Sequence, residues 1–310
     1  MQKFKDSYYG FLIGDAAGIP IKYEDRRKLL ENPVTEMIGY GSYAVPAGSW
    51  SDESSMMLAT MDSICHSNGI DFNDMMTKYS EWISFAKYTS VGEVFDIGRT
   101  TLKAIIRFQE EGQPLGLASE NDNGNGSVVR MLPIAFYANV KKLGEDDIID
   151  LVCQSSSLTH GHEISKLGCY IYVRYMMFLL AGCDKKKSYE LIKKLDYSFF
   201  SMKSRKAYKR ILEDDITKYS IEQISSSGYI VNTLETVIWC IFNTNNFRHA
   251  ILGTINLGGD TDTIGALTGA LAGIIYGFNS IPEEWLEVLQ KREYLKLMYT
   301  SFIKTLNNLK

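Results

Sequence analysis

The sequence Leu257-Gly258-Gly259-Asp260-Thr261-Asp262-Thr263 leads directly into the uncharged run Ile264-Gly265-Ala266-Leu267-Thr268-Gly269-Ala270-Leu271-Ala272-Gly273. Asp and Thr are poor residues inside a helix but good ones at its start, because their oxygens accept hydrogen bonds from free N–H groups of the first turn. Glycine at every fourth position of the run leaves one helix face bare. The stretch therefore predicts a buried helix that begins near Asp260 and that a second helix can approach closely.

The N-terminal segment has the same spacing of glycines. Gly10, Gly14 and Gly18 are also four residues apart, and Asp15 lies among them. Two helices with bare faces can cross at a short distance. We therefore expect these two segments to pack together and to hold Asp15 close to Asp260.

A second cluster of oxygen-bearing side chains, Trp50-Ser51-Asp52-Glu53-Ser54-Ser55, precedes the apolar run Met56-Met57-Leu58-Ala59. Helix capping by Ser51 or Asp52 is one explanation. Binding of a hard cation such as Mg²⁺ or Ca²⁺ is another explanation, since these ions prefer clustered carboxylate and hydroxyl oxygens. Together the two clusters would supply the six or so oxygens of a binuclear site.

The composition is that of an ordinary globular protein. The 310 residues are 45% hydrophobic and 23% charged, with a net charge of −4, which argues against nucleic acid or an anionic membrane as partner. The apolar run 264–278 is shorter than the roughly 20 residues that a membrane span needs. Five scattered cysteines without a CxxC pair suggest reduced thiols and a cytoplasmic protein.

Apolar residues recur mostly at intervals of three and four, which is typical of helices. The helices that this pattern predicts are 4–18, 52–67, 72–86, 96–111, 126–139, 146–158, 164–181, 186–195, 203–213, 231–243, 247–255, 262–277 and 283–306. Only 34–43 has the character of a strand. The sequence thus predicts one all-α domain over residues 1–310.

Several motifs, taken in order, resemble the ADP-ribosylglycohydrolase family. They are Gly14-Asp15-Ala16-Ala17-Gly18-Ile19-Pro20, Trp50-Ser51-Asp52-Glu53-Ser54, Gly124-Asn125-Gly126-Ser127-Val128-Val129-Arg130-Met131-Leu132-Pro133, Leu158-Thr159-His160, Gly259-Asp260-Thr261-Asp262-Thr263 and Gly269-Ala270-Leu271-Ala272-Gly273-Ile274-Ile275-Tyr276-Gly277. The resemblance covers nearly the whole chain. It implies a compact all-α domain that binds two Mg²⁺ (or Mn²⁺) ions at the base of a cleft.

The resemblance also implies roles for individual residues. The ligands of the two ions would be Ser51, Asp52, Glu53, Asp260, Asp262 and Thr263. The loop Gly124-Asn125-Gly126-Ser127 would help to hold ADP-ribose, together with Asp15 and His160. Independently of the family, a helix that opens after this loop would offer N–H groups to a phosphate, although the loop also has the composition of a plain turn.

Asp96 is a candidate catalytic residue beside Asp52 and Glu53. Phe95-Asp96-Ile97-Gly98-Arg99-Thr100-Thr101 is similar to a segment of the family members that act on ADP-ribosyl-arginine, in which the acidic residue lies near the scissile bond. A helix cap at Asp96 is the alternative explanation.

His160, His162 and Glu163 allow a different interpretation, a transition-metal site. Only His66 and His249 could complete such a site, and neither lies in a recognisable motif. A substrate-contacting His160 fits better, because the family carries Thr-His here.

Two residues depart from the family pattern. Lys22 stands where many members have Glu, and Glu53 stands where the usual motif has Asp. We therefore expect a metal-dependent hydrolase that cleaves the bond between ADP-ribose and an acceptor, either arginine on an ADP-ribosylated protein or a small-molecule conjugate. The alternative is an ADP-ribose-binding protein of the same fold without turnover.

Overall fold

The structure is a computed structural model that describes residues 2–310. Its α-helices are α1 (Gln2–Gly18), α2 (Arg26–Glu31), α3 (Asp52–Ser67), α4 (Phe72–Phe85), α5 (Arg99–Glu111), α6 (Met131–Lys141), α7 (Glu145–Ser157), α8 (Glu163–Leu180), α9 (Lys185–Ile192), α10 (Met202–Ala207), α11 (Lys209–Leu212), α12 (Ile230–Asn243), α13 (Phe247–Ile255), α14 (Thr261–Tyr276), α15 (Glu283–Val288) and α16 (Arg292–Asn308). Short 3₁₀ turns are η1 (Ile19–Ile21), η2 (Val128–Arg130), η3 (Ile216–Lys218), η4 (Ile221–Gln223) and η5 (Phe278–Ser280). The all-α class predicted from the sequence is confirmed.

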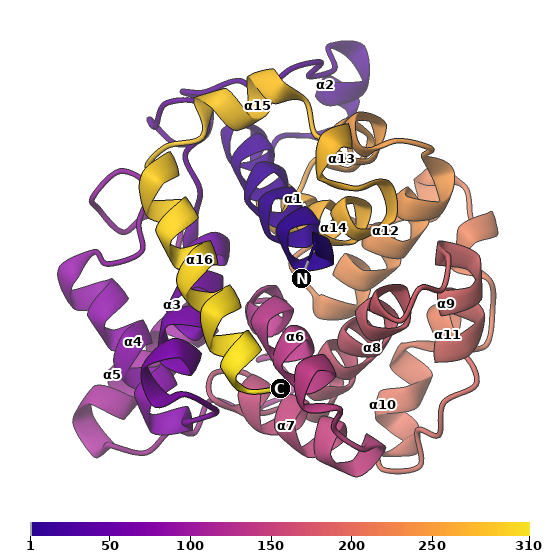
Figure 1. The fold of residues 1–310 in the computed structure, drawn as a ribbon. Coiled ribbons are helices and arrows are strands. Elements are labelled where there is room, and N and C mark those ends of the chain that lie inside the picture. Colours follow the sequence, from indigo (N-terminus) through magenta and orange to yellow (C-terminus); the bar gives the residue numbers. More distant parts are fainter. Residues whose placement is uncertain (1) are drawn as a thin grey trace.

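Helices α1 and α14 lie side by side near the centre of the molecule (Figure 1). A Cβ atom on Gly14 would lie 2.0 Å from the carbonyl oxygen of Gly265, and one on Gly10 would lie 2.2 Å from that of Gly269. The two glycine series therefore face each other, and the backbones are in direct contact. The predicted close crossing is confirmed, and it brings the end of α1 to the beginning of α14.

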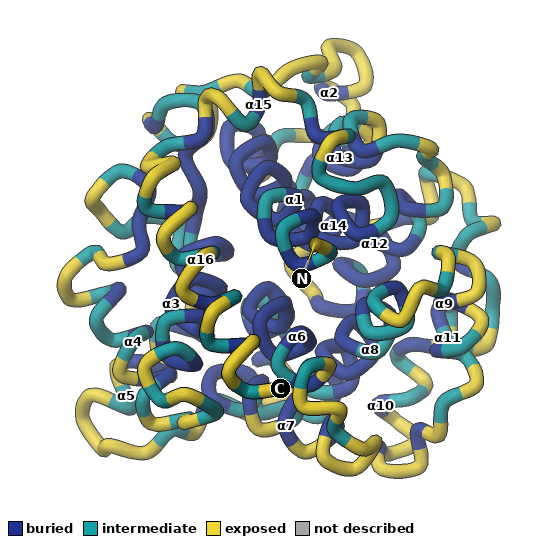
Figure 2. The backbone as a smooth tube through the Cα atoms, viewed as in Figure 1, coloured by how far each residue is buried: buried dark blue, intermediate teal, exposed yellow. Residues whose placement is uncertain are grey.

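The other helices surround this pair, and α13, α12 and α8 all pack against α14. Figure 2 shows buried backbone in the central helices and exposed residues on the outer turns. Every residue of α14 from Thr261 to Ile274 is buried, the carboxylate of Asp262 included. No helix within residues 2–310 combines the length and apolar character needed to cross a membrane.

Segment 34–43, predicted as a possible strand, is irregular in the structure. The N–H of Val34 donates to the side-chain oxygen of Asn256 at 2.8 Å, and the Asn256 amide donates back to the Val34 carbonyl at 2.9 Å. A side chain thus supplies the hydrogen bonds that a neighbouring strand would have supplied. Across residues 2–310 the only β pairings are isolated bridges.

Several predicted helices are altered in the structure. The segment 283–306 splits into α15 and α16, because Lys291 adopts a left-handed φ of 43° and the Gln290 N–H donates to the Gly48 carbonyl at 3.1 Å. The segment 203–213 is also divided, into α10 and α11, at Tyr208, whose φ and ψ of −95° and 16° lie outside the helical region. Helix α5 begins at Arg99 rather than 96, since Asp96 has a φ of 52° that no right-handed helix accepts.

Candidate active site

The first turn of α14 forms one wall of the site. Gly258 and Gly259 have φ values of 70° and 74°, and a Cβ on Gly259 would lie 2.3 Å from the Ser226 carbonyl oxygen. This loop delivers Asp260 as the residue before the helix and Asp262 inside its first turn. The N-terminal end of a helix dipole stabilises negative charge, which favours carboxylates at this position.

The first turn of α3 forms the facing wall, and Asp15 of α1 holds it in place. Ser51 is the N-cap: its hydroxyl accepts from the Glu53 N–H at 3.3 Å and donates to Asp15 at 2.8 Å. The Asp15 carboxylate also accepts from Ser54, from the N–H at 2.9 Å and from the hydroxyl at 2.5 Å. Asp15 therefore serves as a buried anchor that fixes the direction of α3.

The two walls meet through Glu53 and Thr263. The Thr263 hydroxyl donates a short hydrogen bond to Glu53 Oε1. Each of Asp52, Glu53 and Asp262 can direct one carboxylate oxygen into a volume in which these oxygens lie within 4.8 Å of one another. Asp52 Oδ1 is buried and has no hydrogen-bond partner among residues 2–310. Buried carboxylate oxygens without a donor are costly, and a bound cation would satisfy them.

Lys22 lies among the carboxylates of Asp96, Asp260 and Asp262. Its ammonium nitrogen is 2.5 Å from Asp96 Oδ2, 2.9 Å from Asp262 Oδ2 and 3.2 Å from Asp260 Oδ1. The side chain is only 5% exposed. The sequence marked Lys22 as a departure from the family pattern but gave no sign of this central position.

The electrostatics of the site follow from burial and mutual repulsion. Burial, followed by the Asp262 charge, raises the pKa of Asp15 to about 7, and burial raises the pKa of Asp262 to about 6. The pKa values of Asp52 and Glu53 also rise well above their usual range for the same two reasons. Burial acts to lower the pKa of Lys22, but the surrounding carboxylates outweigh it and keep the ammonium charged.

The loop that carries Asn125 joins the site by pairing with a distant segment. The Asn125 N–H donates to the Gly228 carbonyl at 3.1 Å, and its side-chain amide donates to Asp260 Oδ2 at 2.6 Å. The loop continues into η2 rather than directly into an α-helix. The expectation that a helix begins at 126 is therefore wrong, because α6 starts only at Met131. The prediction that this loop helps to hold ADP-ribose stays a prediction.

His160 lies against this loop, and its tautomer can be assigned from its neighbours. Arg130 donates to the Thr159 hydroxyl oxygen at 2.9 Å, and that hydroxyl lies 2.7 Å from His160 Nδ1. The hydroxyl can donate its proton to Nδ1, and in that arrangement the imidazole proton is on Nε2. Burial, followed by the Arg130 charge, lowers the pKa of His160 to about 3, so the ring is neutral. In the sequence, nothing distinguishes Arg130 and Thr159 from the other residues of their motifs, so their contact with His160 was not predicted.

A pocket of about 300 Å³ connects these elements. The predicted site residues that line it are Asp52, Glu53, Asp96, Gly124, Asn125, Gly126, His160 and Asp260. Lys22, Tyr23, Thr101 and Gly228 line it as well and were not predicted. The predicted residues that lie outside its lining are Asp15, Ser51, Ser127, Asp262 and Thr263. Ser127 is fully buried, with its hydroxyl 3.0 Å from that of Ser156.

The other possibilities raised by the sequence gain no support. His162 caps α8 by accepting from the Ile164 N–H at 3.2 Å, and among residues 2–310 the grouping of potential metal ligands contains no histidine.

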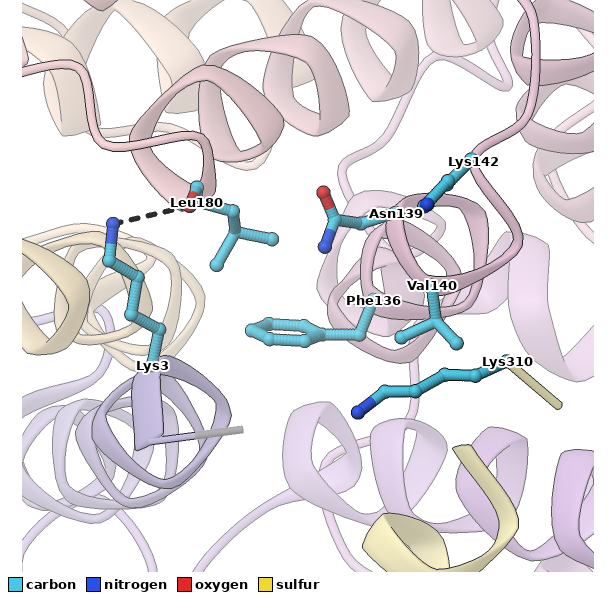
Figure 3. Close-up of a pocket in the computed structure, with 7 residues that line it drawn as sticks. All are labelled: Lys3, Phe136, Asn139, Val140, Lys142, Leu180 and Lys310. Carbon is cyan, nitrogen blue, oxygen red and sulfur yellow. Dashed lines mark hydrogen bonds between the residues drawn. The ribbon is translucent and has the colours of Figure 1, made fainter. Parts of the chain in front are cut away.

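A separate hollow, around Phe136, lies between Lys3, Lys142 and Lys310 (Figure 3). Lys3 is already bonded to the Leu179 carbonyl at 2.5 Å, and none of the predicted site residues reaches this hollow.

An all-α domain with a small pocket of buried carboxylates is the class that fold and site define, and comparison with known proteins identifies the family. The family described as ADP-ribosylglycohydrolase matches residues 1–307. The chain is 30% identical over 297 residues to the ADP-ribosylarginine hydrolase Tri1 of Serratia proteamaculans, covering 94% of this chain and 76% of the relative. It is 29% identical over 294 residues to the ADP-ribosyl-[dinitrogen reductase] glycohydrolase of Rhodospirillum rubrum, covering 92% and 90%.

A solved structure described as an ADP-ribosylglycohydrolase-related protein complex superimposes with a TM-score of 0.82 at 25% identity, covering 98% of both chains. The protein belongs to the ADP-ribosylglycohydrolase family. Its class of chemistry is accordingly the hydrolysis of glycosidic bonds of ADP-ribose.

Proposed function

We propose that this protein removes ADP-ribose from arginine side chains of modified proteins, with a divalent cation bound at its acidic site. The observation that carries the proposal is the charge of the pocket: Asp52, Glu53, Asp96 and Asp260 all line it. A protonated guanidine leaving group is a planar cation, and carboxylates are its natural partners. The names of the bacterial relatives, which refer to ADP-ribosylarginine and to dinitrogen reductase, point in the same direction.

The residues present fit one divalent cation well. Asp52, Glu53 and Asp262 would hold it, since their oxygens converge and Asp52 Oδ1 has no other partner. Mg²⁺ prefers such hard oxygen ligands, and Mn²⁺ accepts them as well. When bound, the ion would orient ribose hydroxyls and lower the pKa of a water molecule.

The protein's own groups supply the other requirements of the reaction. Asp52 or Glu53 would accept the proton of the attacking water, since both carboxylates lie where the ion would hold that water. The surrounding carboxylates stabilise the positive charge that develops on the ribose. His160, neutral and with its proton on Nε2, would donate a hydrogen bond to an oxygen of the substrate. Asp96 lines the pocket, where its carboxylate would pair with the guanidinium group of the leaving arginine.

The second candidate function is binding of ADP-ribose without turnover. The observation that favours it is the position of Lys22, whose ammonium already neutralises part of the acidic cluster. If no ion binds beside it, the pocket retains the surface for ADP-ribose but lacks a group to activate water.

Turnover of defined substrates decides between the two candidates. Peptides carrying ADP-ribosyl-arginine or ADP-ribosyl-serine would be incubated with the protein, with Mg²⁺ or with EDTA, and free ADP-ribose would be measured. We expect release from arginine in Mg²⁺ and little release in EDTA. Activity on serine alone would contradict the arginine assignment. Tight binding of ADP-ribose with no release from either peptide would establish the binding protein instead.

A further inference from the structure

The ammonium group of Lys22 occupies the place where a second cation would have to bind. It donates hydrogen bonds to Asp96 at 2.5 Å and to Asp262 at 2.9 Å, and it forms an ion pair with Asp260 at 3.2 Å. The ammonium is therefore neutralised by three carboxylates where it lies. The carboxylate oxygens that it uses are the ones that a second ion would need.

A divalent ion cannot share these oxygens with the ammonium. Mg²⁺ requires oxygens at about 2.0–2.1 Å in a near-ideal octahedron, and the two ions of a binuclear site lie about 3.5–4 Å apart. A second ion beside Asp260 would have to replace Lys22 Nζ on Asp260 and Asp262. It would also bring a double positive charge against an ammonium that is 5% exposed and cannot retreat into water without losing two ionic hydrogen bonds and an ion pair.

The main chain around Lys22 fixes this arrangement. The Ser42 hydroxyl donates to the Lys22 carbonyl at 2.6 Å, and the Tyr23 N–H donates to the Gly259 carbonyl at 2.7 Å. The second bond ties the residue after Lys22 directly to the residue before Asp260. Lys22 and Asp260 therefore lie on two backbone segments that this hydrogen bond joins.

We infer that Lys22 acts as a built-in cation in place of a second metal ion, so that the protein binds one divalent ion, at Asp52, Glu53 and Asp262. The inference builds on the proposed hydrolytic function, which requires at least one ion. It revises the two ions that the family resemblance implied. In this arrangement Lys22 is a positioning residue, which orients Asp96 and Asp260 along the pocket.

The experiment counts bound ions. Wild-type protein, Lys22→Met and Lys22→Glu would each be titrated with Mn²⁺, and free Mn²⁺ would be followed by its electron paramagnetic resonance signal. We expect one ion per chain in the wild type and two in both variants, with an exchange-coupled spectrum in the variants only. Lys28→Met is the matched control, because Lys28 is 68% exposed and pairs only with Glu24; it should bind one ion.

Three results would overturn the inference. They are two ions in the wild type, a coupled spectrum in the wild type, or a single ion in both Lys22 variants while circular dichroism shows them folded. If the variants fail to fold, anomalous diffraction from Mn²⁺-soaked wild-type crystals replaces them: one peak beside Asp52, with Lys22 still bonded to Asp260, is expected. Two ions together with arginine-linked hydrolysis would reject the role of Lys22 and leave the proposed function intact. No ion in any variant would reject both.

Discussion

The hydroxyl of Thr263, in the first turn of α14, donates a hydrogen bond to the carboxylate of Glu53, in the first turn of α3. This bond joins two helix starts that are 210 residues apart in the sequence. It also fixes one oxygen of Glu53, so that the other is free to bind a cation.

Thr263→Val tests this link. Valine keeps the shape of the buried side chain but cannot donate, and a hydrogen bond to a charged group is worth about 1.5–3 kcal/mol. We expect divalent-ion affinity to fall by about tenfold or more, measured by calorimetric titration with Mn²⁺. An unchanged affinity in a folded variant would mean that Glu53 needs no help from Thr263.

Asp52→Asn separates ion binding from folding. Asp52 Oδ1 is buried without a partner, and burial together with neighbouring carboxylates raises the pKa of Asp52. Removing its charge should abolish most Mn²⁺ binding and stabilise the ion-free protein by about 1–3 kcal/mol, which raises Tm by a few degrees. Thermal unfolding in EDTA measures the gain. Asp150→Asn, at an exposed position of α7, serves as the control and should change neither quantity. A lower Tm for Asp52→Asn would show that the carboxylate has a stabilising partner.

Asp96→Asn tests the choice of acceptor. The substitution keeps the shape of the side chain but removes the charge beside the leaving group. We expect arginine-linked hydrolysis to fall by about 100-fold while the affinity for ADP-ribose changes little. Peptide turnover and a separate binding titration distinguish the two effects. Equal losses in both measurements would assign Asp96 a structural role through Lys22, its partner at 2.5 Å.

His160 gives the protein a defined dependence of stability on pH. Burial and Arg130 lower its pKa to about 3 in the folded state, against about 6.5 in an unfolded chain. Between these values the unfolded state binds more protons. The contribution of His160 to the free energy of unfolding is therefore fully present above pH 6.5 and is lost as the pH falls toward 3. The loss from this group is about 2 kcal/mol between pH 6.5 and pH 5. Urea unfolding at both pH values should show a smaller difference for His160→Gln. A difference equal to that of the wild type would place the imidazole in a less buried or better compensated environment.

Gly14→Ala tests the contact between α1 and α14. Its Cβ would lie 2.0 Å from a backbone oxygen of α14, and neither helix can move without disturbing the core. We expect a loss of at least about 3 kcal/mol in the free energy of unfolding, measured with urea. Gly253→Ala is the matched control, because in α13 the new methyl would meet only the Thr244 side chain, at 3.6 Å. That control should gain about 0.5–1 kcal/mol from its higher helix propensity. A small loss for Gly14→Ala would show that the two helices can separate at low cost.

The sequence by itself determined most of the helices, the pairing of α1 with α14 and the two oxygen clusters at the starts of α3 and α14. These features are local, because helix periodicity, capping residues and the spacing of glycines act over a few residues. Each of them is therefore visible as a pattern in the sequence. The order of motifs was sufficient to identify the family, which the whole-chain match confirms.

Only the tertiary structure decided how the charges of the site are distributed. Lys22 and Asp260 are 238 positions apart, and nothing local to either shows that the ammonium lies among three carboxylates. The same holds for Asp15, which anchors Ser51 and Ser54, and for Asn125, which bonds Asp260. Electrostatic energy depends on distance in space and on burial, and both are set only when the helices have packed.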